Sequence, residues 1–419
     1  MLDTELTSNG IAILPEPGPA KPRPLCTDCG LSRGSMAGEC GRACQFITPD
    51  YEGLETRVHG AARRGADEAF FGPHQAMHRA RLKLAAPGAQ WTGLTTMLAQ
   101  RLLEVDAVDA VLTTAGDPED RWKPRPILVT HPDGMVQARG MRMGYGPLLA
   151  LLEPAVAAGH RRLAVVGLPC QVHALRAVED KLGLVKLYVI GTPCSDNTTT
   201  ENFHLFLAKL VDRPETVTYC EFRPDYRVEL RFDDGRTRLI PFLKLPLADL
   251  PSDFFPLPCQ TCVDYTNALA DITVGYMAGE GDQWLIVRNA KGQEILDRLA
   301  DDVTLEPVGS SGKREAAVRG FLQNTERAAG GLPLRRIPGP LRGFVGLMQR
   351  LFGPRGLEFA KARLEMKAIE TVLHLRRAAP DKVARMVPQH VWQIVAPYGL
   401  RPTSDEAPRA PGSRKERQS

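Results

Sequence analysis

Eight of the nine cysteines of this chain fall into two sets of four. The compact set, spaced C-x2-C-x10-C-x3-C, consists of Cys26, Cys29, Cys40 and Cys44. The dispersed set consists of Cys170, Cys194, Cys259 and Cys262. Four thiolates suit a [4Fe–4S] cluster, because each iron takes one cysteine ligand. Two clusters in one chain would form a path for single electrons, so the cysteines predict a redox protein.

Zinc is the alternative for the compact set, because four cysteines at this spacing also suit a closed tetrahedral site. Disulfides are disfavoured, since the chain is long enough to bury a core and does not start with a secretory apolar segment. Cys220 belongs to neither set, and we interpret it as a packing residue.

Two matching local sequences support the interpretation that the dispersed cysteines form one site. Residues 164–170 read AVVGLPC and residues 188–194 read YVIGTPC, so each is a short apolar run followed by G-x-P-C. The intervening segment 171–182 has apolar residues at helical spacing. We therefore expect a strand–helix–strand unit with parallel strands. This unit places Cys170 and Cys194 at the carboxyl edge of one sheet, where open α/β sheets hold their ligands. A pair of buried cysteines that only pack is the alternative.

Length and composition exclude several classes of protein. With 419 residues, 43% of them hydrophobic, the chain is expected to form a large core and two or more domains. The net charge of +4 is too small to predict a nucleic-acid partner. No apolar run reaches the ~18–20 residues of a membrane span. The sequence also lacks a dinucleotide fingerprint after a strand, a Walker A sequence, a nucleophile elbow and an H-E-x-x-H motif.

The expected elements predict an α/β fold of at least two lobes, with mixed sheets, a parallel strand–helix–strand unit that carries cluster cysteines, and C-terminal helices. Besides the unit above, helices are expected at 92–104, 147–158 and 356–374. Strands are expected at 107–114, 126–130, 217–222, 227–232, 237–241, 271–275 and 284–287. The sequence Asp-Asp-Gly at 233–235 predicts a hairpin turn.

Many motifs, in order from residue 26 to residue 372, resemble those of one family. They are CTDCG (26–30), FFGPHQAMHRAR (70–81), GAQWTG (88–93), GDPEDRWKPRPIL (116–128), VVGLPCQVHALR (165–176), LYVIGTPCSDN (187–197), CQTCVDYTNALADITVGYM (259–277), LIVRNAKG (285–292) and GPRGLEFAK (353–361). The chain resembles the coenzyme F-420 hydrogenase/dehydrogenase β-subunit family. Within it, the chain is most similar to the chlorophyll-pathway branch, which contains the ferredoxin-dependent divinyl (proto)chlorophyllide 8-vinyl reductases and the 7-hydroxymethyl chlorophyll a reductases.

The resemblance implies FAD and two [4Fe–4S] clusters as cofactors, reduced ferredoxin as electron donor and a tetrapyrrole pigment as substrate. The dispersed set matches the cluster motif shared by the family. Cys26, Cys29 and Cys44 match the N-terminal cluster of the chlorophyll branch. Where relatives have a third cysteine soon after the first pair, this chain has Ser32, and we expect Cys40 to replace that ligand.

Candidates for flavin contacts surround these motifs, namely Gln90, Trp91, Thr92, Gly93, Asn267, Asp271, Gly275, Arg288 and Asn289. Segment 90–93 opens a predicted helix whose amides could hold a phosphate. Packing and surface charge are the alternatives for Trp91 and Arg288. No catalytic residue is identified. His74, Asp117 and Glu119 are candidates, and the alternative for each is a surface or satisfied core residue.

The resemblance implies an oxidoreductase of (bacterio)chlorophyll biosynthesis that reduces the 8-vinyl group of a divinyl (proto)chlorophyllide to ethyl. A flavin suits this task because it links a one-electron donor to a two-electron reduction. Two alternatives remain open: a 7-hydroxymethyl pigment reductase, and an electron-transfer β-subunit of a hydrogenase or dehydrogenase. The loop 278–282 is a candidate determinant of the pigment.

We expect six regions. They are a disordered leader (1–24), an N-terminal iron–sulfur segment (25–80), an α/β domain (81–158), a domain with the dispersed cysteines and flavin site (159–310), a helical region (311–400) and a disordered tail (401–419).

The helical region contains an amphipathic stretch with arginines beside its apolar face, which is formed by Leu341, Phe344, Val345, Met348, Leu351 and Phe352. Contact with a membrane surface is one interpretation. Packing on its own domain, or in a homo-oligomer, is the other. The expected location is cytoplasmic, peripheral to the photosynthetic membrane under the first interpretation.

Overall fold

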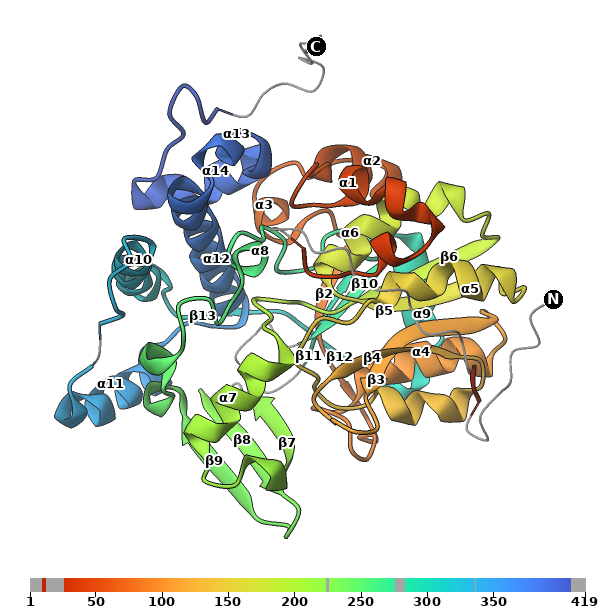
Figure 1. The fold of residues 1–419 in the computed structure, drawn as a ribbon, viewed down its shortest axis with the longest axis horizontal. Coiled ribbons are helices and arrows are strands. Elements are labelled where there is room, and N and C mark those ends of the chain that lie inside the picture. The colour runs from red at the N-terminus through yellow and green to blue at the C-terminus, as the bar shows by residue number, and fades with distance from the viewer. Residues whose placement is uncertain (1–9, 13–25, 224–225, 276–282, 336, 408–419) are drawn as a thin grey trace.

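The structure is a computed structural model that describes residues 10–12, 26–223, 226–275, 283–335 and 337–407. Nine of the strands in these ranges form one mixed sheet (Figure 1). They are β1 (Ile11–Ala12), β2 (Ala76–Leu82), β3 (Ala110–Gly116), β4 (Pro124–Val129), β5 (Arg162–Gly167), β6 (Lys186–Gly191), β10 (Ile272–Gly275), β11 (Gln283–Val287) and β12 (Val303–Pro307). Their spatial order is β1-β4-β3-β5-β6-β10-β11-β2-β12.

The centre of this sheet is parallel and its flanks are antiparallel. β3, β5, β6 and β10 are parallel neighbours. β4 and β1 extend one side, and β11, β2 and β12 the other, by antiparallel pairing. The central strands are buried on both faces, which explains their nearly continuous apolar sequences. The expected mixed α/β fold is confirmed.

Helices cover both faces of the sheet. One face packs against α1 (Cys40–Ala43), α2 (Tyr51–His59), α5 (Leu152–Ala157) and α6 (Pro169–Val178). The other packs against α4 (Leu94–Glu104) and α9 (Ala290–Asp297). The predicted strand–helix–strand unit is confirmed as β5–α6–β6, in a register that pairs Gly167 with Gly191. Both G-x-P-C exits therefore leave the same edge of the sheet.

A second, antiparallel sheet contains β7 (Val217–Phe222), β8 (Arg227–Phe232) and β9 (Thr237–Pro241). It packs with α7 (Thr200–Leu210) around a core that includes Cys220. The predicted turn at 233–235 joins β8 to β9.

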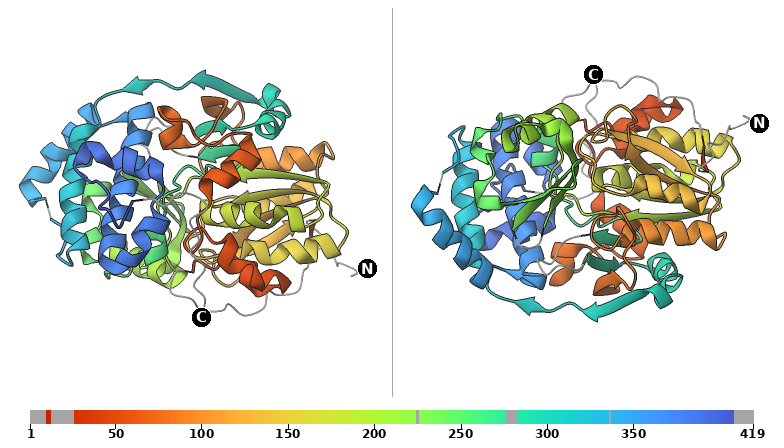
Figure 2. Two further views of the ribbon diagram at one scale, coloured as in Figure 1. Left: turned by 90° about the horizontal axis from the view of Figure 1, so that it is seen from above. Right: turned by 90° about the horizontal axis from the view of Figure 1, so that it is seen from below.

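The C-terminal region is helical and lies beside the main sheet (Figure 2). Its helices are α10 (Glu315–Ala329), α11 (Gly339–Phe352), α12 (Gly356–Ala378), α13 (Val383–Met386) and α14 (Gln389–Val395). The core formed by α10, α12, α13 and α14 also takes in Phe46, Cys44 and Cys170. The remaining short elements are α3 (Asp67–Phe71), α8 (Leu257–Gln260) and β13 (Ser310–Ser311). Within the described ranges, no helix is long and apolar enough to cross a membrane.

The structure differs from the expectations at several places. Ile11 and Ala12 pair with β4, so the predicted leader is ordered at these two residues. The helix expected at 147–158 begins as a 3-10 turn, Leu148–Leu151, before α5. In the predicted tail, Glu406 accepts hydrogen bonds from Arg376 at 2.7 and 2.8 Å. Residues 1–9 and 13–24 of the leader, residues 408–419 and the loop 278–282 lie outside the described residues.

Candidate functional site

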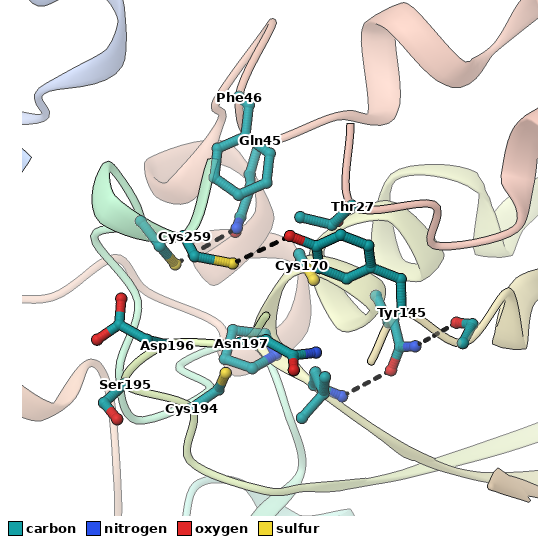
Figure 3. Close-up of a pocket in the computed structure, with 15 residues that line it drawn as sticks. Thr27, Gln45, Phe46, Tyr145, Cys170, Cys194, Ser195, Asp196, Asn197 and Cys259 are labelled. Carbon is teal, nitrogen blue, oxygen red and sulfur yellow. Dashed lines mark hydrogen bonds between the residues drawn. The ribbon is translucent and has the colours of Figure 1, made fainter. Parts of the chain in front are cut away.

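The four cysteines of the dispersed set line one pocket (Figure 3). Cys170 lies in the first turn of α6, directly after β5, and Cys194 follows β6. Cys259 lies in α8, and Cys262 follows it in the chain. The pocket has an empty volume of about 450 Å³, part of it open to solvent. Four thiols from three separate segments thus face one space.

Asn267 holds the two G-x-P-C exits together. Its amide nitrogen donates to the carbonyl of Gly167 at 2.8 Å and to that of Thr192 at 3.2 Å. Its φ of 59° is left-handed, a conformation that asparagine tolerates better than most residues. Asn267, a candidate for a flavin contact, thus has a structural role in positioning Cys170 and Cys194, while the flavin contact stays a prediction.

Gly275 allows the end of β10 to approach the second exit closely. A Cβ at this position would lie 2.3 Å from Cδ of Pro193, so no side chain fits without displacing the proline. This contact fixes the residue that precedes Cys194. The structure thus gives Gly275, another flavin candidate, a packing role.

Helix α12 fixes the segment that carries Cys259 and Cys262. The hydroxyl of Thr371 donates to the carbonyl of Cys262 at 3.0 Å. The buried ammonium of Lys367 donates to the carbonyl of Cys259, to Asp196 at 2.7 Å and to Glu370 at 2.9 Å. The positive charge of Lys367 lowers the pKa of both thiols, against the larger effect of burial, which raises it.

The compact set lies on the loops around α1. Cys26 and Cys29 precede a short turn, Cys40 opens α1, and Cys44 follows it. Burial raises the pKa of Cys29 to about 12, and the charges of Cys44, Cys40 and Cys26 add to this effect. Such mutual effects require the four thiols to lie near one another. Cys40 therefore lies near the other compact cysteines, and its role as the ligand expected at Ser32 stays a prediction.

The two sets adjoin each other. Thr27, between the first two compact cysteines, lines the pocket of the dispersed set together with Cys170. Burial raises the pKa of the Cys170 thiol, and the Thr27 side chain lowers it by a smaller amount. The imidazole of His173, one turn beyond Cys170 in α6, donates through Nδ1 to the carbonyl of Ala43 at 2.9 Å. Asp50 donates its backbone N–H to the other ring nitrogen of His173 at 3.4 Å. Helix α6 thus carries one dispersed cysteine and anchors the compact set.

A cysteine that ligates an iron–sulfur cluster is a thiolate, which accepts hydrogen bonds from nearby N–H groups. The presence of such donors therefore tests whether these cysteines suit ligation. Asp28 donates its N–H to Sγ of Cys26 at 3.3 Å. Backbone N–H groups also lower the pKa of Cys29, Cys44, Cys259 and Cys262 against burial. By contrast, no N–H in the described chain donates to Cys220, whose pKa burial raises to about 12. Donors to sulfur therefore occur in both sets, which suits ligation as thiolates, although the described residues show none at Cys194 either.

Among the described residues, no three His, Cys, Asp or Glu side chains converge closely enough to hold one metal ion. A [4Fe–4S] cluster takes its four thiolates on four different irons, so its ligands stand around the cluster rather than around a single ion.

The remaining flavin candidates have partners within the protein. Asp271 accepts from Arg176 at 2.8 Å, from the N–H of Val189 at 2.7 Å and from Asn289 at 2.8 Å. Arg288 is buried and donates to four oxygens, those of Phe71, Pro73, Thr266 and Thr273. Asn289 also caps α9 by accepting from the N–H of Gly292. These bonds join β10, β11 and α9.

The loop 90–93 is likewise held by a neighbouring strand. Oε1 of Gln283, in β11, accepts from the hydroxyl of Thr92 at 3.1 Å and from the N–H of Leu94 at 3.3 Å. Gly93 donates its N–H to Gln90. Trp91 and Gly93 both have positive φ. The protein's own groups therefore satisfy part of the helix start that we assigned to a phosphate, and we derive no step through a flavin from these residues.

The catalytic candidates lie apart from the cysteine pocket's lining. His74 contacts the carbonyl of Gly72 at 2.9 Å. Asp117 and the exposed Glu119 lie in the β3–β4 loop, where Asp117 accepts the N–H of Glu119 at 3.0 Å. Because β3 is parallel to β5, this loop leaves the same edge of the sheet as the cysteines.

Sequence analysis missed four residues of the site: Thr27, Gln45, Tyr145 and Lys367. Thr27 and Gln45 adjoin compact cysteines in the chain, which is a signal that could have indicated them. The hydroxyl of Tyr145 lies 3.9 Å from Sγ of Cys259. Neither Tyr145 nor Lys367 has a local motif that points to the cysteines.

The fold and the site together define an α/β protein with two adjoining sets of four cysteines. Residues 77–153 match the family model of the N-terminal part of the coenzyme F420 hydrogenase/dehydrogenase β-subunit, and residues 160–310 match that of its C-terminal part. The chain belongs to this family.

Relatives refine this placement. A 7-hydroxymethyl chlorophyll a reductase of Oryza sativa is 37% identical over 89% of this chain and 82% of its own. An uncharacterised protein of Nostoc sp. is 36% identical over 90% of this chain and 94% of its own. These similarities confirm the resemblance to the chlorophyll-pathway branch. A chain of the F420-reducing [NiFe] hydrogenase complex from Methanosarcina barkeri shares the fold, with a TM-score of 0.52 and 19% identity over 64% of this chain and 97% of that chain.

Proposed function

We propose that the protein is a ferredoxin-dependent flavin and iron–sulfur reductase of a chlorophyllide-type tetrapyrrole in the cytoplasm, and that it reduces the 8-vinyl group to ethyl. The observation that carries the proposal is the contact of the two cysteine sets through Thr27 and Cys170. Adjoining clusters allow electrons to pass through one chain, which an enzyme with a one-electron donor needs.

The reaction balances with this donor. A vinyl group takes up two electrons and two protons to become ethyl, and two reduced ferredoxins supply one electron each. When bound, the clusters would accept single electrons, and FAD would supply two-electron transfer to carbon. The compact and dispersed sets would hold the clusters. FAD enters the proposal from the family resemblance alone.

The chain's own residues set the environment of this path. Asn267 and Gly275 fix the exits that carry Cys170 and Cys194. Lys367 places a buried positive charge beside Cys259 and Cys262, where it favours thiolates. We propose that electrons enter at the compact set and leave towards the pigment from the dispersed set.

Reduction of a 7-hydroxymethyl group to methyl is the second candidate, favoured by the name of the rice relative. It also takes two electrons and two protons, and it releases water. An electron-transfer subunit that serves a hydrogenase or dehydrogenase is the third, favoured by the family to which the chain belongs.

An anaerobic assay with reduced ferredoxin and either pigment distinguishes the three candidates. We expect the wild type to convert the divinyl pigment to its 8-ethyl product, as measured by chromatography. The Cys170→Ser variant should lose this activity, while Cys220→Ala, the matched control in β7, should keep it. Conversion of only the 7-hydroxymethyl pigment would establish the second candidate. Conversion of neither by a fully loaded protein would favour the third. A deletion strain that accumulates divinyl pigment would support the first in the cell.

A further inference from the structure

Helix α11 presents an apolar face to solvent. Large side chains on this helix are strongly exposed, namely Leu341 (52%), Phe344 (62%), Leu347 (49%), Leu351 (56%) and Phe352 (70%). At 100° per residue, these positions fall within one broad stripe of the helix. The structure places α11 at the periphery of the molecule (Figure 1). Single exposed apolar residues are ordinary, but a contiguous stripe of five marks an interaction surface.

The opposite side of α11 rests on the rest of the protein. A Cβ at Gly346 would lie 3.6 Å from Cδ1 of Leu243, in the turn after β9. The hydroxyl of Tyr226 donates to the carbonyl of Pro354, just beyond the helix, at 3.1 Å. The helix is therefore supported from the inside while its apolar stripe faces outward.

The charged residues of the sequence segment that contains this stripe all have one sign. Residues 328–357 contain five arginines and no aspartate or glutamate, although the whole chain contains 49 acidic residues among 419. Arg342 lies on α11 itself and is half-buried, with its Nε donating to the carbonyl of Ile337 at 3.0 Å. An apolar stripe in a purely basic segment is the pattern of helices that lie in the interface of an anionic bilayer.

We propose that α11 is a docking surface for an anionic lipid bilayer, in which its apolar stripe inserts at the level of the headgroups. A second copy of the chain suits this face poorly, because a two-fold contact would bring the arginines of both copies together. A protein partner also suits this face less well, because protein interfaces usually carry charges of both signs, which fix how the two partners align. The inference goes beyond the proposed function and does not depend on the cofactors.

Sedimentation of the full-length protein with lipid vesicles tests the proposal. We use vesicles of phosphatidylcholine alone and of phosphatidylcholine with about one-third phosphatidylglycerol. The wild type should bind the anionic vesicles, and added salt should weaken the binding because it screens the arginines. The Phe344→Ser/Leu351→Ser variant should bind roughly tenfold or more weakly, since it loses two of the five exposed apolar side chains of the stripe. Arg342→Glu should also weaken binding to the anionic vesicles.

The matched control is Leu84→Ser/Val185→Ser, which removes two exposed apolar side chains (86% and 77%) outside α11. It should bind as the wild type does. The proposal is overturned if the wild type does not bind anionic vesicles, or if the control loses as much binding as the α11 variant. It is also overturned if the wild type is a dimer that the α11 variant turns into a monomer, or if that variant loses affinity for ferredoxin instead. Unchanged circular dichroism should accompany each variant, because the altered apolar residues are exposed and Arg342 is only half-buried.

Discussion

The side-chain amide nitrogen of Gln45 lies 3.5 Å from Sγ of Cys262, so the neighbour of a compact cysteine donates to a dispersed one. The hydroxyl of Tyr51 donates to the amide oxygen of Gln45 at 2.8 Å and thereby fixes its orientation. The amide nitrogen must then face the sulfur. Since Gln45 directly follows Cys44 in the chain, one residue spans the two sets.

This contact predicts a change in reduction potential. A hydrogen bond to a ligating sulfur stabilises the reduced, more negative cluster and raises its potential. The Gln45→Met variant keeps the size of the side chain but removes the N–H, so we expect a lower midpoint potential for the cluster on the dispersed set. A redox titration followed by electron paramagnetic resonance measures it. The signal from the compact set is the internal control, and equal shifts of both clusters would count against a specific Gln45–Cys262 contact.

The fourth ligand of the compact set can be tested directly. Cys40 is buried and its charge acts on Cys29 together with those of Cys26 and Cys44, whereas Ser32 stands where the family resemblance implies a cysteine. Cys40→Ser should therefore halve the iron content, to about four per chain, while Ser32→Ala should keep about eight. Iron and acid-labile sulfide analyses provide the measurement. Loss of iron in the second variant alone would assign the ligand to Ser32.

Local sequence predicted the part of the site that is built from local structure. The exits at Cys170 and Cys194 follow from two apolar runs and two G-x-P-C turns, and both were placed correctly at one edge of the sheet. Strand β2 was missed because its sequence, AMHRARL, mixes small and charged residues on a half-buried strand. Asn267 and Arg288 are flavin candidates because they surround the Cys259–Cys262 pair in the sequence, and this stays a prediction. Their hydrogen bonds reach residues far away in sequence, and no periodicity reports such contacts.

The buried ammonium of Lys367 is expected to be essential for the order of the Cys259–Cys262 segment. In Lys367→Met, the carboxylates of Asp196 and Glu370 lose their common partner. We expect the free energy of unfolding to fall by about 3 kcal/mol. This is the lower end of the range for broken buried ion pairs, because the Asp196 side chain is still 20% exposed. Denaturant unfolding of the variant against the wild type measures the loss.

Two further variants make this prediction specific. Burial raises the pKa of Asp196 to about 6, so Asp196→Asn in the Lys367→Met background should recover part of the loss by removing an unpaired charge. Lys361→Met, on the same helix, breaks a pair with Asp67 whose carboxylate is 45% exposed, and should cost less than about 1 kcal/mol. Equal losses in the two lysine variants would contradict a special role for Lys367.

We expect acid to weaken the attachment of the compact set to α6, because this attachment depends on the neutral form of His173. Burial lowers the pKa of His173 to about 4 from an ordinary value of 6.5. In the unfolded chain the imidazole of His173 is therefore protonated as the pH falls below about 6.5, whereas in the folded protein it stays neutral until about pH 4. The neutral His173 leaves the free energy of unfolding undiminished above pH 6.5. As the pH falls towards 4, this free energy declines by up to about 3 kcal/mol.

The variant His173→Gln cannot titrate at this position. Its melting temperature should therefore fall less between pH 7 and pH 5 than that of the wild type, even if the variant is less stable at pH 7. Calorimetry at the two pH values gives the comparison. Parallel falls in both proteins would show that His173 does not contribute to acid sensitivity.

The central claim is that the two adjoining cysteine sets hold two [4Fe–4S] clusters, and its most direct test is iron and acid-labile sulfide analysis of anaerobically purified protein. We predict about eight iron and eight sulfide per wild-type chain, and about four of each in both Cys29→Ser and Cys170→Ser. Cys220→Ala should keep the wild-type content. Stoichiometric zinc without labile sulfide in the wild type would contradict the account.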